Sequence, residues 1–251
     1  MTKERRLRSK RIRNRTDTGC DMILDSILNM DCMKGLEQVP DNFVDLIVMD
    51  PPYELQTQGG GAFGNANREY HGQLSPISKG ITNDVLDVLC RKMKAVNIYI
   101  WCNKAQLRQY LDYFDDRGCS VDLLTWHKTN PTPTCNNKYL SDTEYCIFAR
   151  DKGVKLYGSY ETKRKFYVTA SNTDDKKMYG HPTVKPLDII RNLIINSSKE
   201  EEVVMDPFMG SGTTAVACKL TGRHYIGFEI DPEYYTIACN RVNNAGGSGW
   251  F

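Results

Sequence analysis

The stretch VVMDPFMGSGTTAVACKLTGRHYIGFEID, residues 203–231, decides the fold. It predicts a buried strand that ends at Asp206, a glycine-containing turn over 208–212 and a helix that begins at Thr213. The two glycines of the turn allow close approach to the backbone, and the amide-rich start of a helix favours an anionic group. A second strand ends near Glu229, where a Rossmann-type unit places an acid for ribose hydroxyls. The dinucleotide fingerprint G-x-G-x-x-G does not match, because its third glycine is missing.

Strands and helices alternate along the rest of the chain. Strand-like apolar runs occupy residues 44–49, 97–102, 121–127, 144–149, 201–206 and 224–230. Helical spacing of apolar residues occurs at 84–96, 185–198, 213–222 and 232–242. This alternation predicts a mostly parallel sheet that is covered by helices on both faces. A length of 251 residues suits one α/β domain and is short for two.

The composition excludes several classes of protein. A hydrophobic content of 40% and a charged content of 25% are ordinary for a globular protein. No apolar run approaches the roughly 18 residues that a membrane helix needs, so no membrane is expected among the partners. The nine cysteines are odd in number and never form a C-x-x-C pair. We therefore expect neither a disulfide framework nor a metal site, and we expect a reducing compartment.

The charge is unevenly distributed along the chain. Residues 1–15 hold eight Lys and Arg against one acid, which leaves 25 basic and 30 acidic residues in the rest. We expect residues 1–18 to form a basic, flexible arm on a mildly acidic body that spans 19–251. Such an arm suits contact with phosphates, or it serves only as a disordered solubilising leader.

Two segments interrupt the alternation. Residues 54–82 are rich in Gly, Asn, Gln and Ser, which predicts a long mobile loop. Residues 150–180 hold eight Lys and Arg against four acids, with tyrosine and phenylalanine between them. Basic residues mixed with aromatic ones suit phosphate contact and base stacking, so this small insert is a candidate for target recognition. The alternative is a β-hairpin flap that only covers the edge of the sheet.

A second motif makes a resemblance to a known family specific. The run VDLIVM leads into DPPY at 50–53, and DPFMGSGTT stands at 206–214. Together they resemble the amino-directed DNA methyltransferases that use S-adenosyl-L-methionine, in which DPPY is the catalytic motif and F-x-G-x-G the cofactor motif. The order, with the catalytic motif first, resembles the β group of that family. Further stretches that resemble its elements are LNMDCMKGLEQVPDNFVDLIVMDPPY (28–53), LTWHKTNPTP (124–133), SDTEYCIFAR (141–150) and GHPTVKP (180–186).

The resemblance covers the chain from about residue 20 to residue 242. It implies an α/β, Rossmann-like class I methyltransferase fold with a seven-stranded, mostly parallel sheet and helices on both faces. An antiparallel edge strand is expected near 144–149.

The catalytic role that the resemblance implies for residues 50–53 has a chemical reason. An exocyclic amino nitrogen is conjugated with its ring and is therefore a poor nucleophile. The carboxylate of Asp50 and the backbone carbonyl of Pro51 can accept its two hydrogens and free its lone pair. Pro51 and Pro52 fix the backbone, and Tyr53 is expected to stack on the target base after the base has flipped out of the duplex. Transfer is then an in-line attack on the sulfonium methyl, which depends on positioning and electrostatics.

The resemblance also assigns cofactor-binding residues. Asp31 is expected to bind the adenine amino group, with Cys32 beside it, and Glu229 the ribose hydroxyls. Asp206 lies where a carboxylate suits the ammonium group of the methionine part. The residues expected to form the wall around that part are Phe208, Gly210, Ser211, Gly212 and Thr213.

Some residues are expected to serve the cofactor or the base pocket from other segments. Thr183 and Lys185 are expected to reach the cofactor carboxylate, although a turn that only starts the next helix would also explain them. Asp50 is expected to contact the cofactor from the catalytic side. Asn130 and Trp126 could line the base pocket, and Trp126 could equally belong to the core.

Adenine N6 in double-stranded DNA is the expected target, because relatives that act on cytosine N4 usually begin the catalytic motif with Ser instead of Asp50. Cytosine N4 stays open as the alternative, since both reactions need the same amino activation. Protein-glutamine methyltransferases disagree in two respects, because their related motif begins with Asn and their cofactor motif lies upstream. A non-enzymatic DNA-binding module would explain the basic segments but not an intact catalytic motif.

The resemblance further implies a cytoplasmic protein encoded by a bacterium or a phage. A homodimer and a cognate restriction endonuclease are further expected partners.

Overall fold

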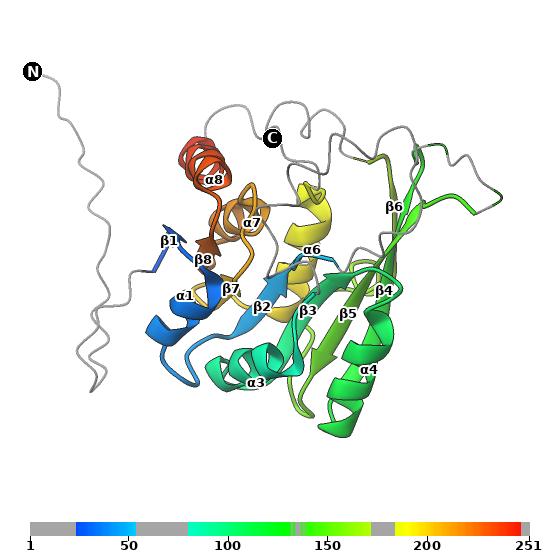
Figure 1. The fold of residues 1–251 in the computed structure, drawn as a ribbon, viewed down its shortest axis with the longest axis horizontal. Coiled ribbons are helices and arrows are strands. Elements are labelled where there is room, and N and C mark those ends of the chain that lie inside the picture. Colours follow the sequence, from blue (N-terminus) through cyan, green and yellow to red (C-terminus); the bar gives the residue numbers. More distant parts are fainter. Residues whose placement is uncertain are drawn as a thin grey trace, which may run out of the picture.

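An eight-stranded sheet runs through the molecule, with helices on both of its faces (Figure 1). The computed structural model describes residues 24–53, 80–131, 133, 137, 139–171 and 184–246. The strands are β1 (Ser26–Asn29), β2 (Leu46–Met49), β3 (Asn97–Cys102), β4 (Ser120–Lys128), β5 (Thr143–Arg150), β6 (Phe166–Thr169), β7 (Val203–Asp206) and β8 (His224–Glu229). The helices are α1 (Cys32–Gln38), α3 (Asn83–Lys92), α4 (Leu107–Asp116), α6 (Leu187–Ser197), α7 (Thr213–Thr221) and α8 (Pro232–Asn244).

Alternate residues of the central strands build two separate cores. Leu46 and Val48 of β2 pack in a cluster with residues of α6, α7 and α8. Ile47 and Met49 of the same strand pack in a second cluster with residues of α1, α3 and α4. Because side chains of a strand alternate between the faces of the sheet, a strand buried on both faces must be apolar throughout, as β2 is.

The strand order is β1-β8-β7-β2-β3-β5-β4-β6. β2 and β7 are parallel neighbours, with Ile47 opposite Met205. The next strands in the chain, β3 and β8, then pair on the outer sides of β2 and β7. The boundary between β2 and β7 is therefore a topological switch point, and open α/β sheets bind ligands beyond the carboxyl ends of the strands at such points.

The predicted fold class is confirmed, but two details of the expected sheet are wrong. The described part of the chain forms eight strands instead of seven. The antiparallel strand expected at an edge near 144–149 is β5, and it lies inside the sheet, antiparallel to both β3 and β4. The edges of the sheet are β1 and β6.

The residue pattern explains both differences. Cys146, Ile147, Phe148 and Ala149 are all buried, as the interior position of β5 requires. β6 has only four residues, which alternate between exposed and half-buried, so its apolar signal is weak. It lies within the predicted insert at 150–180, for which a flap over the sheet edge is the alternative to target recognition. β1 is equally short, and α1 and α4 were not among the helices expected from the sequence.

Parts of the predicted domain organisation lie outside the described residues. These parts are the arm at 1–18, residues 54–79 of the predicted loop and residues 172–180 of the predicted insert. Within the stretches that the structure describes, no helix is both long enough and apolar enough to cross a membrane.

Gly35 of α1 allows that helix to pack closely against β8. A Cβ at this position would overlap the ring of Phe228. In an exposed helix, Gly to Ala stabilises by about 1 kcal/mol, but here the clash with a core side chain reverses the sign. We expect Gly35→Ala to lower the free energy of unfolding by about 1–3 kcal/mol, measured by urea denaturation.

Lys34→Ala is the matched control, since Lys34 is exposed in the same helix. Its free energy of unfolding should change by less than about 0.5 kcal/mol. A Gly35→Ala variant as stable as the wild type would contradict the close packing of α1 on β8.

Candidate active site

Three of the predicted acids meet at the carboxyl ends of the parallel strands. Asp50 follows β2 directly, Asp206 ends β7 and Glu229 ends β8. These strands are parallel neighbours, with Asp206 opposite Gly227 of β8, so their carboxyl ends lie side by side. The topology thus joins the catalytic motif to the cofactor motif across the switch point, although more than 150 residues separate them in sequence.

Asp50 is held by two neighbours. The Tyr53 hydroxyl donates a hydrogen bond to Oδ1 of Asp50 at 2.7 Å. Nζ of Lys185, which stands just before α6, donates to Oδ2 at 2.5 Å and lies 3.1 Å from the Tyr53 hydroxyl oxygen. The Asp50 side chain is 22% exposed and the Lys185 side chain 7%. The structure therefore brings Lys185 to the catalytic motif.

Glu144 joins this group and was not among the predicted site residues. Its Oε2 lies 3.0 Å from Nζ of Lys185, and its Oε1 lies 2.5 Å from Nζ of Lys128. Because β5 is antiparallel to its neighbours, its first residues lie at the edge where β3 and β4 end, with Glu144 opposite Trp126. The available sequence signal is Glu144 directly before the apolar run of β5 and Lys128 at the end of β4.

Burial and charge shift the pKa values of these groups in different directions. Burial raises the pKa of Asp50, and the ammonium of Lys185 offsets this only in part. Burial lowers the pKa of Lys185, but the carboxylates of Asp50 and Glu144 outweigh it and raise the pKa. Burial likewise raises the pKa of Glu144, but the ammonium groups of Lys185 and Lys128 bring it below its usual value. Burial and the charge of Asp50 raise the pKa of Tyr53, so its hydroxyl remains a donor.

On the cofactor side, Asp206 fixes the start of the glycine turn. Its Oδ1 accepts the backbone N–H of Phe208 at 3.0 Å, and its Oδ2 accepts the Thr214 hydroxyl at 2.6 Å. Burial raises the pKa of Asp206 to about 7, although both hydrogen bonds act in the opposite direction. The side chain is thus a carboxyl group whose charge changes near neutral pH.

Glu229 closes the turn from the neighbouring strand. Its Oε2 accepts the N–H of Gly210 at 2.6 Å, and its Oε1 accepts the N–H of Asp231 at 2.9 Å. Gly212 caps α7 with φ 85°, and a Cβ there would lie 2.9 Å from Cα of Ala238 in α8. The glycine is therefore required by both backbone conformation and space, and the turn keeps an open backbone.

Arg241 of α8 supports the same turn and was also missed from the sequence. It is buried, and its Nη1 donates to the backbone oxygen and the hydroxyl of Ser211, both at 2.8 Å. It also donates to the Thr213 hydroxyl at 3.2 Å. An arginine in an amphipathic helix gives no sign of an inward direction, so only the packing of α8 reveals this role.

Asp31 and Cys32 lie beyond the end of β1, next to the end of β8. The N–H of Met30 donates to the backbone oxygen of Glu229 at 3.0 Å, which brings Asp31 to the same edge of the sheet. Oδ1 of Asp31 accepts the N–H groups of Met33 and Lys34 and caps α1. Burial, with the charge of Asp31, raises the pKa of Cys32 to about 11, so its sulfur is a neutral thiol.

The remaining predicted positions have different outcomes. Thr183 lies outside the described residues. Trp126 is 1% exposed and belongs to the core, where its Nε1 donates to the Thr169 hydroxyl. Oδ1 of Asn130 accepts the N–H of Ser171 at 2.6 Å, so this side chain fastens the segment after β6 to the end of β4.

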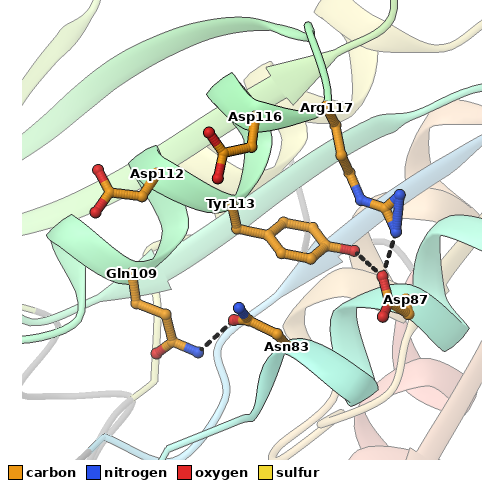
Figure 2. Close-up of a pocket in the computed structure, with 7 residues that line it drawn as sticks. All are labelled: Asn83, Asp87, Gln109, Asp112, Tyr113, Asp116 and Arg117. Carbon is orange, nitrogen blue, oxygen red and sulfur yellow. Dashed lines mark hydrogen bonds and ion pairs between the residues drawn. The ribbon is translucent and has the colours of Figure 1, made fainter.

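A separate hollow of about 490 Å³ lies between α3 and α4 (Figure 2). Its lining residues are Asn83, Asp87, Gln109, Asp112, Tyr113, Asp116 and Arg117. Asp87 accepts the Tyr113 hydroxyl at 2.8 Å and also pairs with Arg117. The lining contains none of the predicted site residues. The residues that the structure describes include no group of three or more His, Cys, Asp or Glu placed to hold a metal ion.

The fold and the paired motifs at its switch point define a class I methyltransferase. The family model described as DNA methylase, N6_N4_Mtase, matches residues 44–240, and the chain belongs to this family. It is therefore a DNA methyltransferase, which excludes the reading as a non-enzymatic binding module.

A curated relative agrees with this membership, and solved structures agree with the fold. The Type II methyltransferase M2.LlaDCHI of Lactococcus lactis subsp. cremoris is 31% identical over 245 residues, which cover 86% of this chain and 88% of that protein. The structure of the M1.HpyAVI-SAM complex is similar with a TM-score of 0.61 and 24% identity, and covers 86% of this chain and 98% of that one. The structure of the cytosine-N4-specific PvuII DNA methyltransferase is similar with a TM-score of 0.64 and 20% identity, and covers 86% of this chain and 85% of that one.

The raised pKa of Asp206 generates a prediction for cofactor binding. If its carboxylate binds an ammonium group, affinity for S-adenosylmethionine falls as Asp206 becomes protonated. With the pKa at about 7, the dissociation constant should rise by about eightfold between about pH 7.5 and about pH 6. Isothermal titration calorimetry at a series of pH values measures this.

Asp206→Asn is the control, because its side chain has no charge to lose. It should bind more weakly throughout and show a flat affinity over the same pH range. A wild-type affinity that does not change with pH would contradict the contact between Asp206 and the ammonium group.

Proposed function

We propose that the chain transfers a methyl group from S-adenosylmethionine to the N6 amino group of adenine in double-stranded DNA. The observation that carries this proposal is the position of Asp50 and Pro51 at the switch point, beside the glycine turn. One end of the site offers acceptors for an amino group, and the other offers an open backbone and buried carboxylates.

The residues 50–53 activate and hold the amino group. When bound, S-adenosylmethionine supplies a methyl group on a positively charged sulfur. Asp50 and the Pro51 carbonyl accept the two amino hydrogens, so the nitrogen lone pair becomes available. The lone pair forms the bond to the methyl carbon while the carbon–sulfur bond breaks and leaves its electron pair on sulfur. The surplus proton passes from nitrogen to Asp50, and Tyr53 holds the ring of the flipped base.

The cofactor side fits S-adenosylmethionine by the chemistry of its donors. Asp206 presents a carboxylate to the ammonium group, and Glu229 presents one to the ribose hydroxyls. Each carboxylate oxygen has a second lone pair, so the hydrogen bonds that fix the turn leave acceptors for the ligand. Asp31 takes the adenine amino group, with Cys32 beside it, and the wall consists of Phe208, Gly210, Ser211, Gly212 and Thr213.

The predicted roles of Thr183 and Lys185 at the cofactor carboxylate stay predictions. Nζ of Lys185 donates to Asp50 and to the Tyr53 hydroxyl and forms an ion pair with Glu144. To reach the cofactor, Lys185 has to release one of these three partners. The expected contact of Asp50 with the cofactor also stays a prediction; in its favour, the charge of Asp50 contributes to the raised pKa of Asp206.

The choice of adenine rests on Asp50 as the first residue of the motif. Cytosine N4 remains the second candidate, because the cytosine-N4-specific PvuII enzyme has a similar fold. The fold alone therefore does not separate the two bases.

The recognition of DNA is assigned to the insert at 150–180, together with loop 54–82 and the basic arm at 1–18. In the described part of the insert, Tyr160 is 85% exposed and Phe166 51%. Lys163 is exposed as well, and such a surface suits phosphate contact and stacking. A homodimer and a cognate restriction endonuclease are further parts of the proposal, and the endonuclease is in keeping with the name of the similar M2.LlaDCHI, a Type II methyltransferase.

The catalytic assignment is tested by methylation of plasmid DNA in a host without DNA methylation. The wild type should produce N6-methyladenine in the hydrolysed DNA, and modification-sensitive sequencing gives its sequence context. Asp50→Ala should lose about a hundredfold or more in turnover, because it removes an acceptor for the amino group. N4-methylcytosine in the product would favour the second candidate, and full turnover of Asp50→Ala would contradict the mechanism.

The recognition assignment is tested separately through the salt dependence of DNA binding. Lys163→Ala should weaken binding and reduce the slope of log affinity against log salt by about 1, as the loss of one phosphate contact does. Lys94→Ala is the control, because Lys94 pairs with Asp45 at the opposite edge of the sheet. An unchanged slope in Lys163→Ala would remove this lysine from the DNA surface.

A further inference from the structure

We propose that Glu144 is a positioning residue of the methyltransferase site. It shares the ammonium group of Lys185 with Asp50 and thereby sets how strongly Lys185 holds the Asp50 carboxylate. This inference rests on the proposed function, in which Asp50 accepts an amino hydrogen of the target base.

The shared ammonium is visible in the geometry of Lys185. Its Nζ lies 2.5 Å from Asp50, 3.0 Å from Glu144 and 3.1 Å from the Tyr53 hydroxyl oxygen. Lys185 donates hydrogen bonds to Asp50 and to the Tyr53 hydroxyl, and its contact with Glu144 is an ion pair. The Tyr53 hydroxyl donates to Asp50 in turn, so among the described residues Glu144 is the ion-pair partner of Lys185 that lies outside the catalytic motif.

Lys185 occupies a position that helix electrostatics disfavour. It immediately precedes Pro186, the N-cap of α6, where the positive end of the helix dipole repels a cation. Its side chain is only 7% exposed, so little water can compensate. Two carboxylates, Asp50 after β2 and Glu144 on β5, offset this cost by pairing with the buried ammonium.

The titratable groups around Lys185 divide into charged and neutral ones. The groups that face it are Asp50 and Tyr53 after β2, Cys102 on β3, Lys128 on β4, and Glu144 and Cys146 on β5, with Asp206 of β7 beyond Asp50. Burial raises the pKa of Cys102 to about 12 and that of Cys146 further, so both are neutral thiols. Asp50, Lys185, Glu144 and Lys128 then form a row of alternating charges that sums to zero.

Lys128 completes the row of charges and connects it to β6, which belongs to the predicted insert at 150–180. Its Nζ lies 2.5 Å from Oε1 of Glu144, so Glu144 bridges two lysines with its two oxygens. Lys128 stands opposite Thr169 of β6, and the N–H of Thr129 donates to the backbone oxygen of Thr169. Glu144 thus lies between the catalytic motif and the strand that ends the described part of the insert.

The consequence for Asp50 follows from removing the charge of Glu144. Without it, Lys185 pairs with Asp50 alone and draws the carboxylate away from the amino group. Loss of the Glu144 charge also lowers the pKa of Asp50, because that charge raises it. In a profile of methylation rate against pH, the acidic limb therefore moves to lower pH while the plateau rate falls. A purely structural role would lower the amount of folded enzyme without moving this limb.

The test measures single-turnover methylation against pH for the full-length enzyme with saturating S-adenosylmethionine and plasmid DNA. Glu144→Gln should reduce the plateau rate by about tenfold to a hundredfold, the range seen when a partner that orients an active-site ligand is lost. Its acidic limb should move to lower pH. Glu200→Gln, an exposed acid at the opposite edge of the sheet, should leave rate and limb unchanged.

A double variant separates positioning from folding. Glu144→Gln alone leaves Lys128 without its carboxylate partner and should destabilise the protein. The double variant Glu144→Gln with Lys128→Met removes both members of the Glu144–Lys128 ion pair and should restore stability. We expect the double variant to remain slow, because Lys185 is still held by Asp50 alone. Recovery of the rate together with stability would overturn the inference, as would a wild-type rate and limb in Glu144→Gln.

Asp50→Asn distinguishes this inference from the proposed function. Full turnover of Asp50→Asn would contradict the catalytic role of Asp50 itself. An inactive Asp50→Asn beside an unaffected Glu144→Gln would contradict only the role of Glu144.

Discussion

The parallel pairing of β2 with β7 is the constraint on which the rest of the structure depends. It places the DPPY motif beside the glycine turn and creates the switch point where the chain turns away on both sides. The two cores, one on each face of the sheet, keep these strands buried and therefore rigid. Chemistry that depends mainly on positioning gains from such a base, since the reacting groups are attached directly to strand ends.

At the carboxyl ends of the strands, charge is arranged differently on the catalytic side and on the cofactor side of the site. On the catalytic side, Asp50 and Glu144 are matched by two lysines, which lower the pKa of Glu144 and partly offset the effect of burial on Asp50. On the cofactor side, Asp206 and Glu229 have hydrogen bonds from the turn, and burial raises the pKa of both. An incoming cationic sulfonium and ammonium would supply the positive charge that this side lacks.

Much of this site could be predicted from the sequence. Asp50, Asp206 and Glu229 each follow an apolar run, and parallel strands carry such residues to one edge. Glu144 could not be assigned, because its place depends on β5 running antiparallel inside the sheet. Arg241 depends in the same way on how α8 packs against the turn. The four-residue strand β6 is too short and too exposed for its pattern to stand out from the basic insert around it.

The central claim is that one site holds the amino group against Asp50 and Pro51. A crystal structure with the demethylated cofactor product and a duplex that contains the target sequence tests it most directly. The flipped adenine should place its N6 atom within about 2.7–3.2 Å of the Asp50 carboxylate and the Pro51 carbonyl oxygen. A base bound elsewhere, or one whose amino group points away from Asp50, would contradict this account.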